Sequence, residues 1–273
     1  MSILIAICDK SNAEKVLRFA APIISRIGEP VVLLTIIGHG LDSTLPEATE
    51  ILTESCQSLR IPEIHAKTRT GNPYTEILHE SEAGNYNLVI VGEWPSRRLR
   101  HGHLASSPVC VAERIPTLTI LVKQEARLVR NVLICDSGSE ISPTINHFAD
   151  VLDDLLAGDG DITIFHVMSQ ISAAPGIQGK QLRVGADQLI KESSPEGQIL
   201  KRDIRKLERP GVRLHTKVAH GLVVDEVVSE SHRGDYDLVV IGGHILNGIQ
   251  SFLLDDLAHK ILAQVKQPIL IIR

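Results

Sequence analysis

The sequence predicts an α/β protein made of two tandem five-stranded parallel-sheet sandwiches of the Rossmann-like type. Three observations lead to this prediction. The chain has 273 residues, 43% of them hydrophobic, which is enough to bury a core in each of two domains. A segment of the first half recurs in the second half. Short runs of Val, Ile and Leu alternate with helix-like stretches, as in parallel sheets that are covered by helices on both faces.

The recurring segment is TGNPYTEILHESEAGNYNLVIVG, residues 70–92, which aligns without a gap with HGLVVDEVVSESHRGDYDLVVIG, residues 220–242. The shared positions are Gly71, Glu76, Glu80, Ser81, Gly84, Tyr86, Leu88, Val89 and Gly92, which recur as Gly221, Glu226, Glu230, Ser231, Gly234, Tyr236, Leu238, Val239 and Gly242. The same alignment continues without a gap to the C-terminus, where ILVK, residues 120–123, aligns with LIIR, residues 270–273. Each repeat therefore ends on a strand.

The front ends of the repeats match as well, and they set the domain boundary. IAICDKS, residues 5–11, resembles VLICDSG, residues 132–138, which places Asp9 opposite Asp136. We therefore predict a first domain of residues 1–125 and a second domain of residues 126–273.

In the first repeat the predicted elements follow one another in a regular order. They are LIAIC (4–8), a helix to about Ile27, VVLLTII (31–37), a second helix, IHAKTRT (64–70), a third helix, LVIVG (88–92), a fourth helix and LTILV (118–122). In the second repeat the connection after the second strand is longer, from about Ser169 to Pro210. Residues 182–208 of this connection are predicted to form a long, partly broken helix.

Composition excludes several classes of function. A net charge of -5 and a pI near 6.2 argue against a nucleic-acid partner, and 3% aromatic residues leave few stacking platforms for bases. No apolar run approaches the length of a membrane span, and the N-terminal run is too short for a signal peptide, so we expect a cytoplasmic protein. Four scattered cysteines predict no zinc site, and Cys8 and Cys135 are expected to be buried thiols.

Doubly wound sheets bind ligands outside the carboxyl ends of their strands, where the strand order reverses. The candidate positions are Asp9 and Asp136, after the first strand of each repeat, and the turns after Gly92 and Gly242. An Asp after a strand is equally an ordinary cap for the next helix, so both interpretations stay open.

The order of these features resembles the universal stress protein family in its tandem form, with two domains on one chain. The resemblance covers nearly the whole chain. It implies that the two domains pair through their last strands as an internal pseudo-dimer, and that two chains associate into a homo-oligomer. The apolar strands LTILV and PILIIR favour such pairing, because unpaired edges would expose their hydrogen-bonding groups.

Nucleotide-binding members of this family carry Gly, two residues, Gly, nine residues, then Gly followed by Ser or Thr. In such a loop the backbone N–H groups and the start of the fourth helix hold the phosphates. The second repeat retains Gly242 but has Ile245 at the second glycine, and Gly248 of the same loop is a further candidate ligand-binding residue. Asp255 and Asp256 replace the Gly-Ser pair, and we predict that they cap the fourth helix in place of a phosphate.

The first repeat departs from the motif in another way. Gly92 is retained, whereas Pro95 and Ala105 replace the other two glycines. Ser106 or Ser107 before Pro108 predicts an N-cap and a first helical residue. Arg97 and Arg98 could take over phosphate recognition from the lost backbone donors, or could belong to a solvated loop. The two histidines of the HGH run at residues 101–103 are interpreted as exposed polar side chains, and no metal site is predicted.

The leading hypothesis is a non-catalytic, stress-associated regulatory or ligand-sensing protein with degenerate nucleotide-binding loops. The alternative is an ATP-binding protein or weak nucleotide hydrolase, related to the adenine-nucleotide α hydrolases, that uses a rebuilt site in the first domain. The sequence contains no GxxxxGK[ST] loop, which would have supported nucleotide hydrolysis. A third hypothesis is a sensor of another lipid-like or anionic metabolite, which would bind in a cleft between the two repeats and at the connection from Ser169 to Pro210.

Overall fold

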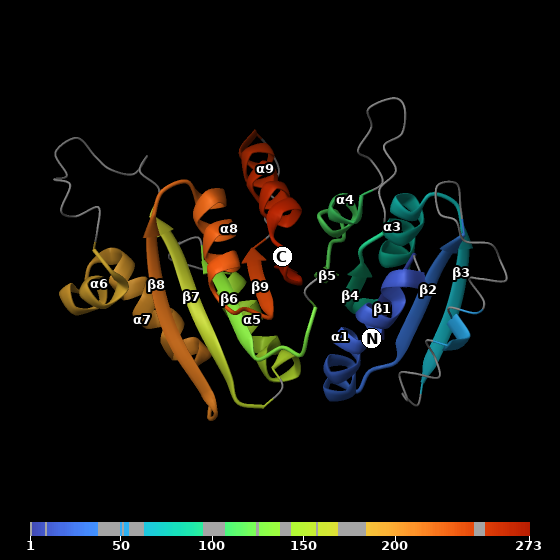
Figure 1. Ribbon diagram of the computed structural model, residues 1–273, viewed down its shortest axis with the longest axis horizontal. Helices are drawn as coiled ribbons and strands as arrows, with labels where there is room; N and C mark the ends of the chain where they lie inside the picture. Colours follow the sequence, from blue (N-terminus) through green and yellow to red (C-terminus); the bar gives the residue numbers. More distant parts are fainter. Residues whose placement is uncertain are drawn as a thin grey trace. The chain divides into compact units, whose positions relative to one another are not determined.

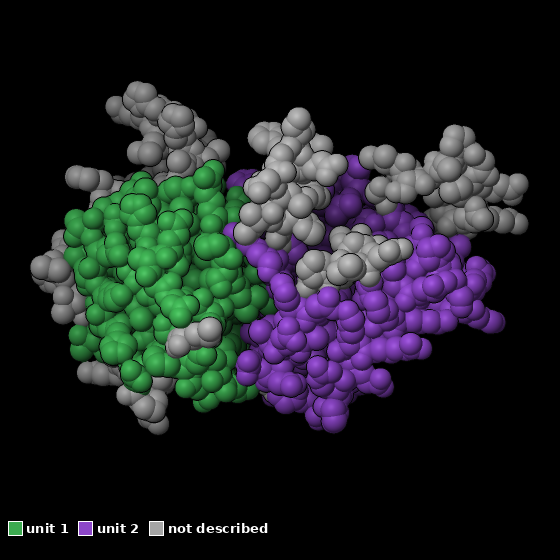
Figure 2. All heavy atoms as spheres, turned by 180° about the vertical axis from the view of Figure 1, so that it is seen from behind, with its two compact units in different colours: residues 1–128, 268–271 green, residues 129–267, 272–273 purple. Residues whose placement is uncertain are grey.

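The computed structural model describes most of the chain as two compact units. The described residues are 2–8, 10–37, 50, 52–54, 63–94, 107–123, 126–136, 143–156, 158–168, 184–242 and 249–273. Unit 1 comprises residues 1–128 and 268–271, and unit 2 comprises residues 129–267 and 272–273; Figure 2 colours the two sets of residues separately. The change of unit after residue 128 lies near the domain boundary drawn from the sequence.

Unit 1 is a parallel sheet to which one antiparallel strand is added (Figure 1). Its strands are β1 (Ser2–Ile7), β2 (Val31–Ile37), β3 (Ile64–Thr70), β4 (Tyr86–Gly92), β5 (Leu118–Val122) and the C-terminal β10 (Ile269–Ile272). Their order is β3-β2-β1-β4-β5-β10, and only β10, which pairs with β5, is antiparallel. The predicted pairing of the two last strands is therefore confirmed. Because β5 lies between β4 and β10, it has no unpaired edge.

The structure gives bounds for three helices among the described residues of unit 1: α1 (Lys10–Ile27), α3 (Pro73–Ala83) and α4 (Pro108–Ala112). They fall into two groups. Helix α1 packs against β1 and β4, whereas α3 and α4 contact each other and pack against β2, β4 and β5. The start of α3 is local in origin: Asn72 Oδ1 accepts a hydrogen bond from Tyr74 N at 2.9 Å, and Pro73 follows.

Unit 2 repeats the same plan with a longer connection. Its strands are β6 (Asn131–Asp136), β7 (Gly160–Met168), β8 (Val212–His220) and β9 (Leu238–Gly242), in the order β9-β6-β7-β8 and all parallel. Its helices are α5 (Pro143–Leu155), α6 (Ala186–Glu192), α7 (Pro195–Leu207), α8 (Val223–Arg233) and α9 (Ile249–Gln264). The second repeat also supplies β10, so the first repeat contributes β1–β5 and the second β6–β10, which is five strands each, as predicted.

The predicted broken helix of the long connection is present as α6 and α7. The break occurs at Ser193, which has the left-handed φ of 53°, and at Ser194, whose Oγ accepts a hydrogen bond from Gly197 N at 3.0 Å. Pro195 then begins α7, where its missing N–H needs no partner. A cap and a proline therefore start a second helix instead of prolonging the first.

One prediction about the fourth helix of the second repeat is wrong. Helix α9 begins at Ile249, so Asp255 and Asp256 lie inside it and cannot be its N-cap. The upstream residues IQSFLL contain neither glycine nor proline, and nothing in the backbone chemistry prevents the helix from starting earlier. The side chains of these two acids lie outside the described part of the structure.

The recurring residues Glu80 and Tyr86 form a buried polar network in unit 1. The Glu80 carboxylate is 3% exposed and accepts hydrogen bonds from Tyr86 Oη at 2.6 Å, Lys67 Nζ at 2.7 Å and Arg69 Nε at 2.9 Å. This network joins α3 to β3 and β4. The pKa of Glu80 reflects it: burial acts to raise it, but the three donors together lower it to about 2.

Unit 2 contains the same network at the equivalent positions. Glu230 Oε1 accepts hydrogen bonds from Tyr236 Oη at 2.7 Å and from Lys217 Nζ at 2.6 Å. The glycines Gly84 and Gly234 recur for a related reason, because a Cβ at either would lie 2.0 Å from the ring of the following tyrosine. The contacts at these recurring positions therefore hold the helix to the sheet in each unit.

Two remaining sequence predictions concern the thiols and membrane insertion. Cys8 is buried, as predicted. Cys135 is partly buried, and burial, together with the charges of Asp136 and Glu230, raises its pKa to about 12. Among the described helices, none combines the length and apolar character that a membrane span requires.

Candidate functional site

In unit 1 the strand order reverses between β1 and β4, and the carboxyl ends of these two strands are where a doubly wound sheet would bind a ligand. Gly92 is the last residue of β4, and a Cβ there would lie 2.6 Å from Val16 Cγ2 of α1. Gly92 therefore allows α1 to approach the sheet closely. Asp9, which follows β1, and the predicted residues Arg97, Arg98 and Ser106, which follow β4, lie outside the described residues.

An ion pair that sequence reasoning missed follows directly after β4 and β5. Glu93 Oε1 lies 3.9 Å from Lys123 Nζ, and Lys123 is 6% exposed. Burial raises the pKa of Glu93, against the opposing charges of Lys123 and Lys15, and burial also lowers the pKa of Lys123. A carboxylate thus stands where a phosphate loop would begin. One sign of this ion pair was present in the sequence: a basic residue follows the last strand of each repeat, Lys123 in the first and Arg273 in the second.

The start of α4 matches the prediction for Ser107. Its Oγ accepts a hydrogen bond from Cys110 N at 3.2 Å, and Pro108 is the first helical residue. The hydroxyl is therefore already engaged by the helix. Because α4 is only five residues long, few peptide dipoles add up at its N-terminus. The start of α4 would therefore attract a phosphate more weakly than the start of a long helix whose N-terminal hydroxyl is not yet hydrogen-bonded.

In unit 2 the predicted residues Asp136 and Gly242 are brought together. They end the neighbouring strands β6 and β9, following the paired residues Cys135 and Ile241. Asp136 is 6% exposed, and His166 Nδ1 lies 3.4 Å from its backbone oxygen. A Cβ at Gly242 would lie 2.3 Å from Thr144 Oγ1, so this glycine allows α5 to approach β9. Gly248 lies outside the described residues.

A second buried acid, Asp203 of α7, lies close enough to Asp136 for their charges to interact. Asp203 is fully buried, and its Oδ1 accepts a hydrogen bond from Arg202 Nε at 2.8 Å. Its Oδ2 accepts no hydrogen bond from any described residue. Burial raises the pKa of Asp203 to about 6, the bond from Arg202 opposes this shift, and the charge of Asp136 adds to it.

The raised pKa of Asp203 predicts how the stability of unit 2 depends on pH. Because the folded protein holds this proton more tightly than the unfolded chain, the contribution favours folding at low pH and is lost as the pH rises from about 4 to 6. Asp203→Asn should flatten the wild-type profile in this window by about 2 kcal/mol. Chemical denaturation of both proteins across the window measures the difference, and parallel profiles would show that the shift is absent.

The sequence profile of the universal stress protein family matches residues 129–273 of this chain, which is more than half of it. The chain belongs to the universal stress protein family. A universal stress protein of Methanocaldococcus jannaschii is 22% identical over 167 residues, which cover 60% of this chain and 94% of that protein.

Solved structures of universal stress proteins match the fold over the full length of the chain. One from Archaeoglobus fulgidus is 16% identical, with a TM-score of 0.66 over 100% of this chain and 96% of that chain. A putative universal stress protein from Pseudomonas aeruginosa is 15% identical, with a TM-score of 0.69 over 99% of this chain and 92% of that chain. The predicted family and the α/β fold of two five-stranded halves are thereby confirmed.

Proposed function

We propose that this universal stress protein is a non-catalytic, ligand-sensing regulatory protein in which the phosphate loop of unit 1 no longer holds a nucleotide. The observation that carries the proposal is the chemistry at the carboxyl end of β4. Glu93 places a carboxylate there, and the hydroxyl of Ser107 is engaged by a five-residue helix. A triphosphate at this position would meet the negative charge of Glu93, and Pro95 removes one N–H donor from the loop sequence.

The test is a calorimetric titration with ATP and magnesium of the wild type and of an Arg97→Ala, Arg98→Ala variant. We expect the variant to titrate like the wild type, because these arginines do not rebuild a phosphate site. A matched control, Arg18→Ala with Arg26→Ala, removes two exposed cations from α1. Micromolar binding that fails in the loop variant but persists in the control would refute the proposal and establish the ATP-binding alternative.

Catalysis is tested separately by release of inorganic phosphate from ATP. A non-catalytic protein should show no turnover above the rate of the buffer. Turnover that disappears in Asp9→Asn or Asp136→Asn would make the chain a nucleotide hydrolase, because these are the acids that follow the first strand of each repeat.

A further inference from the structure

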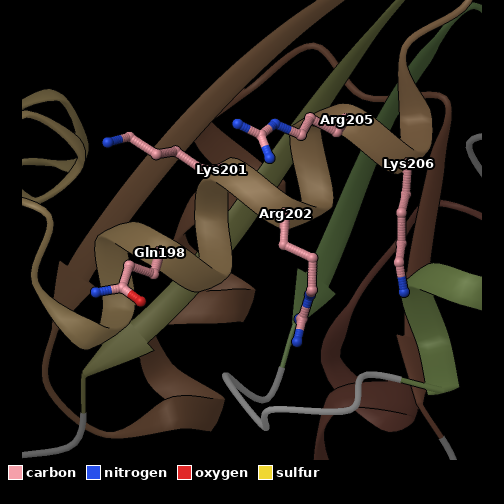
Figure 3. A pocket seen from close by; sticks show the side chains of 5 residues that line it. All are labelled: Gln198, Lys201, Arg202, Arg205 and Lys206. Atoms are coloured by element: carbon pink, nitrogen blue, oxygen red, sulfur yellow. The ribbon is translucent and has the colours of Figure 1, made fainter.

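Helix α7 of unit 2 carries a stripe of basic side chains that line one pocket. The pocket has a volume of about 520 Å³, and its lining residues are Gln198, Lys201, Arg202, Arg205 and Lys206 (Figure 3). Gln198, Arg202 and Lys206 are four residues apart, as are Lys201 and Arg205, so the five residues form two neighbouring rows along the helix. The α7 stripe, as we call these five residues, belongs to the long connection that distinguishes the second repeat from the first.

Three of the four cations in the α7 stripe form no ion pair among the described residues, although the charge of Lys206 acts on Asp203 at longer range. Lys201 Nζ donates to Ser193 Oγ at 3.2 Å and Lys206 Nζ donates to Asn146 Oδ1, and both acceptors are uncharged. Within the described ranges, neither these lysines nor Arg205 forms an ion pair with a carboxylate. Like charges four residues apart on a helix repel each other, and a bound anion would relieve this repulsion.

Arg202 differs from the other three cations because a buried acid holds it in place. Its guanidinium contacts Asp203 Oδ1 through both Nε at 2.8 Å and Nη2 at 2.7 Å. Its side chain nevertheless remains 26% exposed, on the pocket side of the helix. A guanidinium fixed in this way loses little rotamer freedom when it binds a phosphate oxygen.

The helix that carries the stripe is itself firmly positioned. A Cβ at Gly197 would lie 2.0 Å from the backbone oxygen of Leu189, so α7 crosses α6 at close range. Lys206 reaches Asn146 of α5. Figure 3 shows Arg202 and Lys206 extending from α7 in one direction and Lys201 and Arg205 in another, which presents two pairs of cations. Two pairs suit a ligand that carries more than one anionic group.

We propose that the α7 stripe binds a small molecule carrying two or more phosphate groups. The inference rests on the proposed ligand-sensing function and names the chemical class of its ligand. Guanidinium forks recognise phosphate oxygens through paired hydrogen bonds, and lysines add point charges. The pocket volume lies within the range of ordinary small-ligand sites.

The test is a calorimetric titration of the full chain with inorganic tripolyphosphate. The variant Lys201→Gln, Arg205→Gln should weaken binding about tenfold or more, since it removes one cation pair. Lys191→Gln, an exposed position on α6, controls for loss of a surface charge and should change the affinity less than about twofold. Thermal denaturation of each variant verifies that the fold is retained.

Further arms of the titration identify what is recognised. Tripolyphosphate should bind more tightly than monophosphate. Because the proposed contacts are to phosphate groups, ATP should bind about as tightly as tripolyphosphate. An affinity unchanged in the stripe variant overturns the inference, as does a preference for single-stranded RNA over tripolyphosphate. Binding lost in Arg97→Ala, Arg98→Ala but kept in the stripe variant would place the anion in unit 1. That result would refute the proposed function as well.

Discussion

Replacing Gly84 with alanine is expected to destabilise unit 1 by about 3 kcal/mol, the upper range for forcing a methyl group into a filled core. A Cβ at this position would lie 2.0 Å from Cε2 and 2.5 Å from Cζ of Tyr86. The backbone of Gly84 has a φ of -95°, which any residue can adopt, so the effect is purely steric. Equilibrium unfolding in denaturant measures it.

The ring of Tyr86 cannot move aside without a second loss. Tyr86 is 8% exposed, and its hydroxyl donates to the buried Glu80 carboxylate at 2.6 Å. Gly185→Ala is the matched control, because a Cβ there meets no atom within 4 Å and the φ of -81° is ordinary. Equal unfolding free energies for the Gly84 and Gly185 variants would mean that the tyrosine ring does not exclude a side chain at the recurring glycine.

The second large effect concerns the charge of Glu80. Its pKa is lowered from 4.5 to about 2 in the folded protein, so its contribution to stability is complete above about pH 4.5 and is lost as the pH falls towards 2. Glu80→Gln should therefore reduce the free energy of unfolding near neutral pH by up to about 3 kcal/mol. It should also reduce the loss of stability on acidification.

Glu82→Gln provides the comparison for that experiment. Glu82 lies on the same helix, α3, and is exposed, so its neutralisation should leave the pH profile close to that of the wild type. Unfolding free energies of the three proteins between neutral pH and pH 2 decide the matter. A Glu80→Gln profile parallel to the wild type would mean that Lys67, Arg69 and Tyr86 do not stabilise the charge.

The sequence predicted the parallel strands and the repeat, because burial on both faces leaves continuous apolar runs that are easy to recognise. It also identified Glu80 and Tyr86 as recurring, but could not say why. Their partner Lys67 lies on another strand, and only the folded sheet brings its ammonium group within 2.7 Å of the carboxylate. Recurrence shows that a position is retained, whereas its contacts depend on tertiary structure.

The candidate site shows the same limit more clearly. Ser107 was predicted correctly because a helix cap is a local interaction over three residues. Asp255 was misplaced because its role was inferred from alignment with a loop motif, whereas the helix start depends on the residues upstream. Asp203 and Glu93 were missed, because their burial beside other charges arises only when distant elements pack together.

The position of β10 has a consequence for synthesis. The strand that completes unit 1 lies at residues 269–272, after the whole of residues 129–267. At ribosomal rates, translation of that intervening stretch takes on the order of ten seconds. During this interval β5 is an open apolar edge on a nascent chain, which is the kind of surface that pairs with other strands. Synthesis of the last four-residue strand therefore closes an edge that the nascent chain has left open.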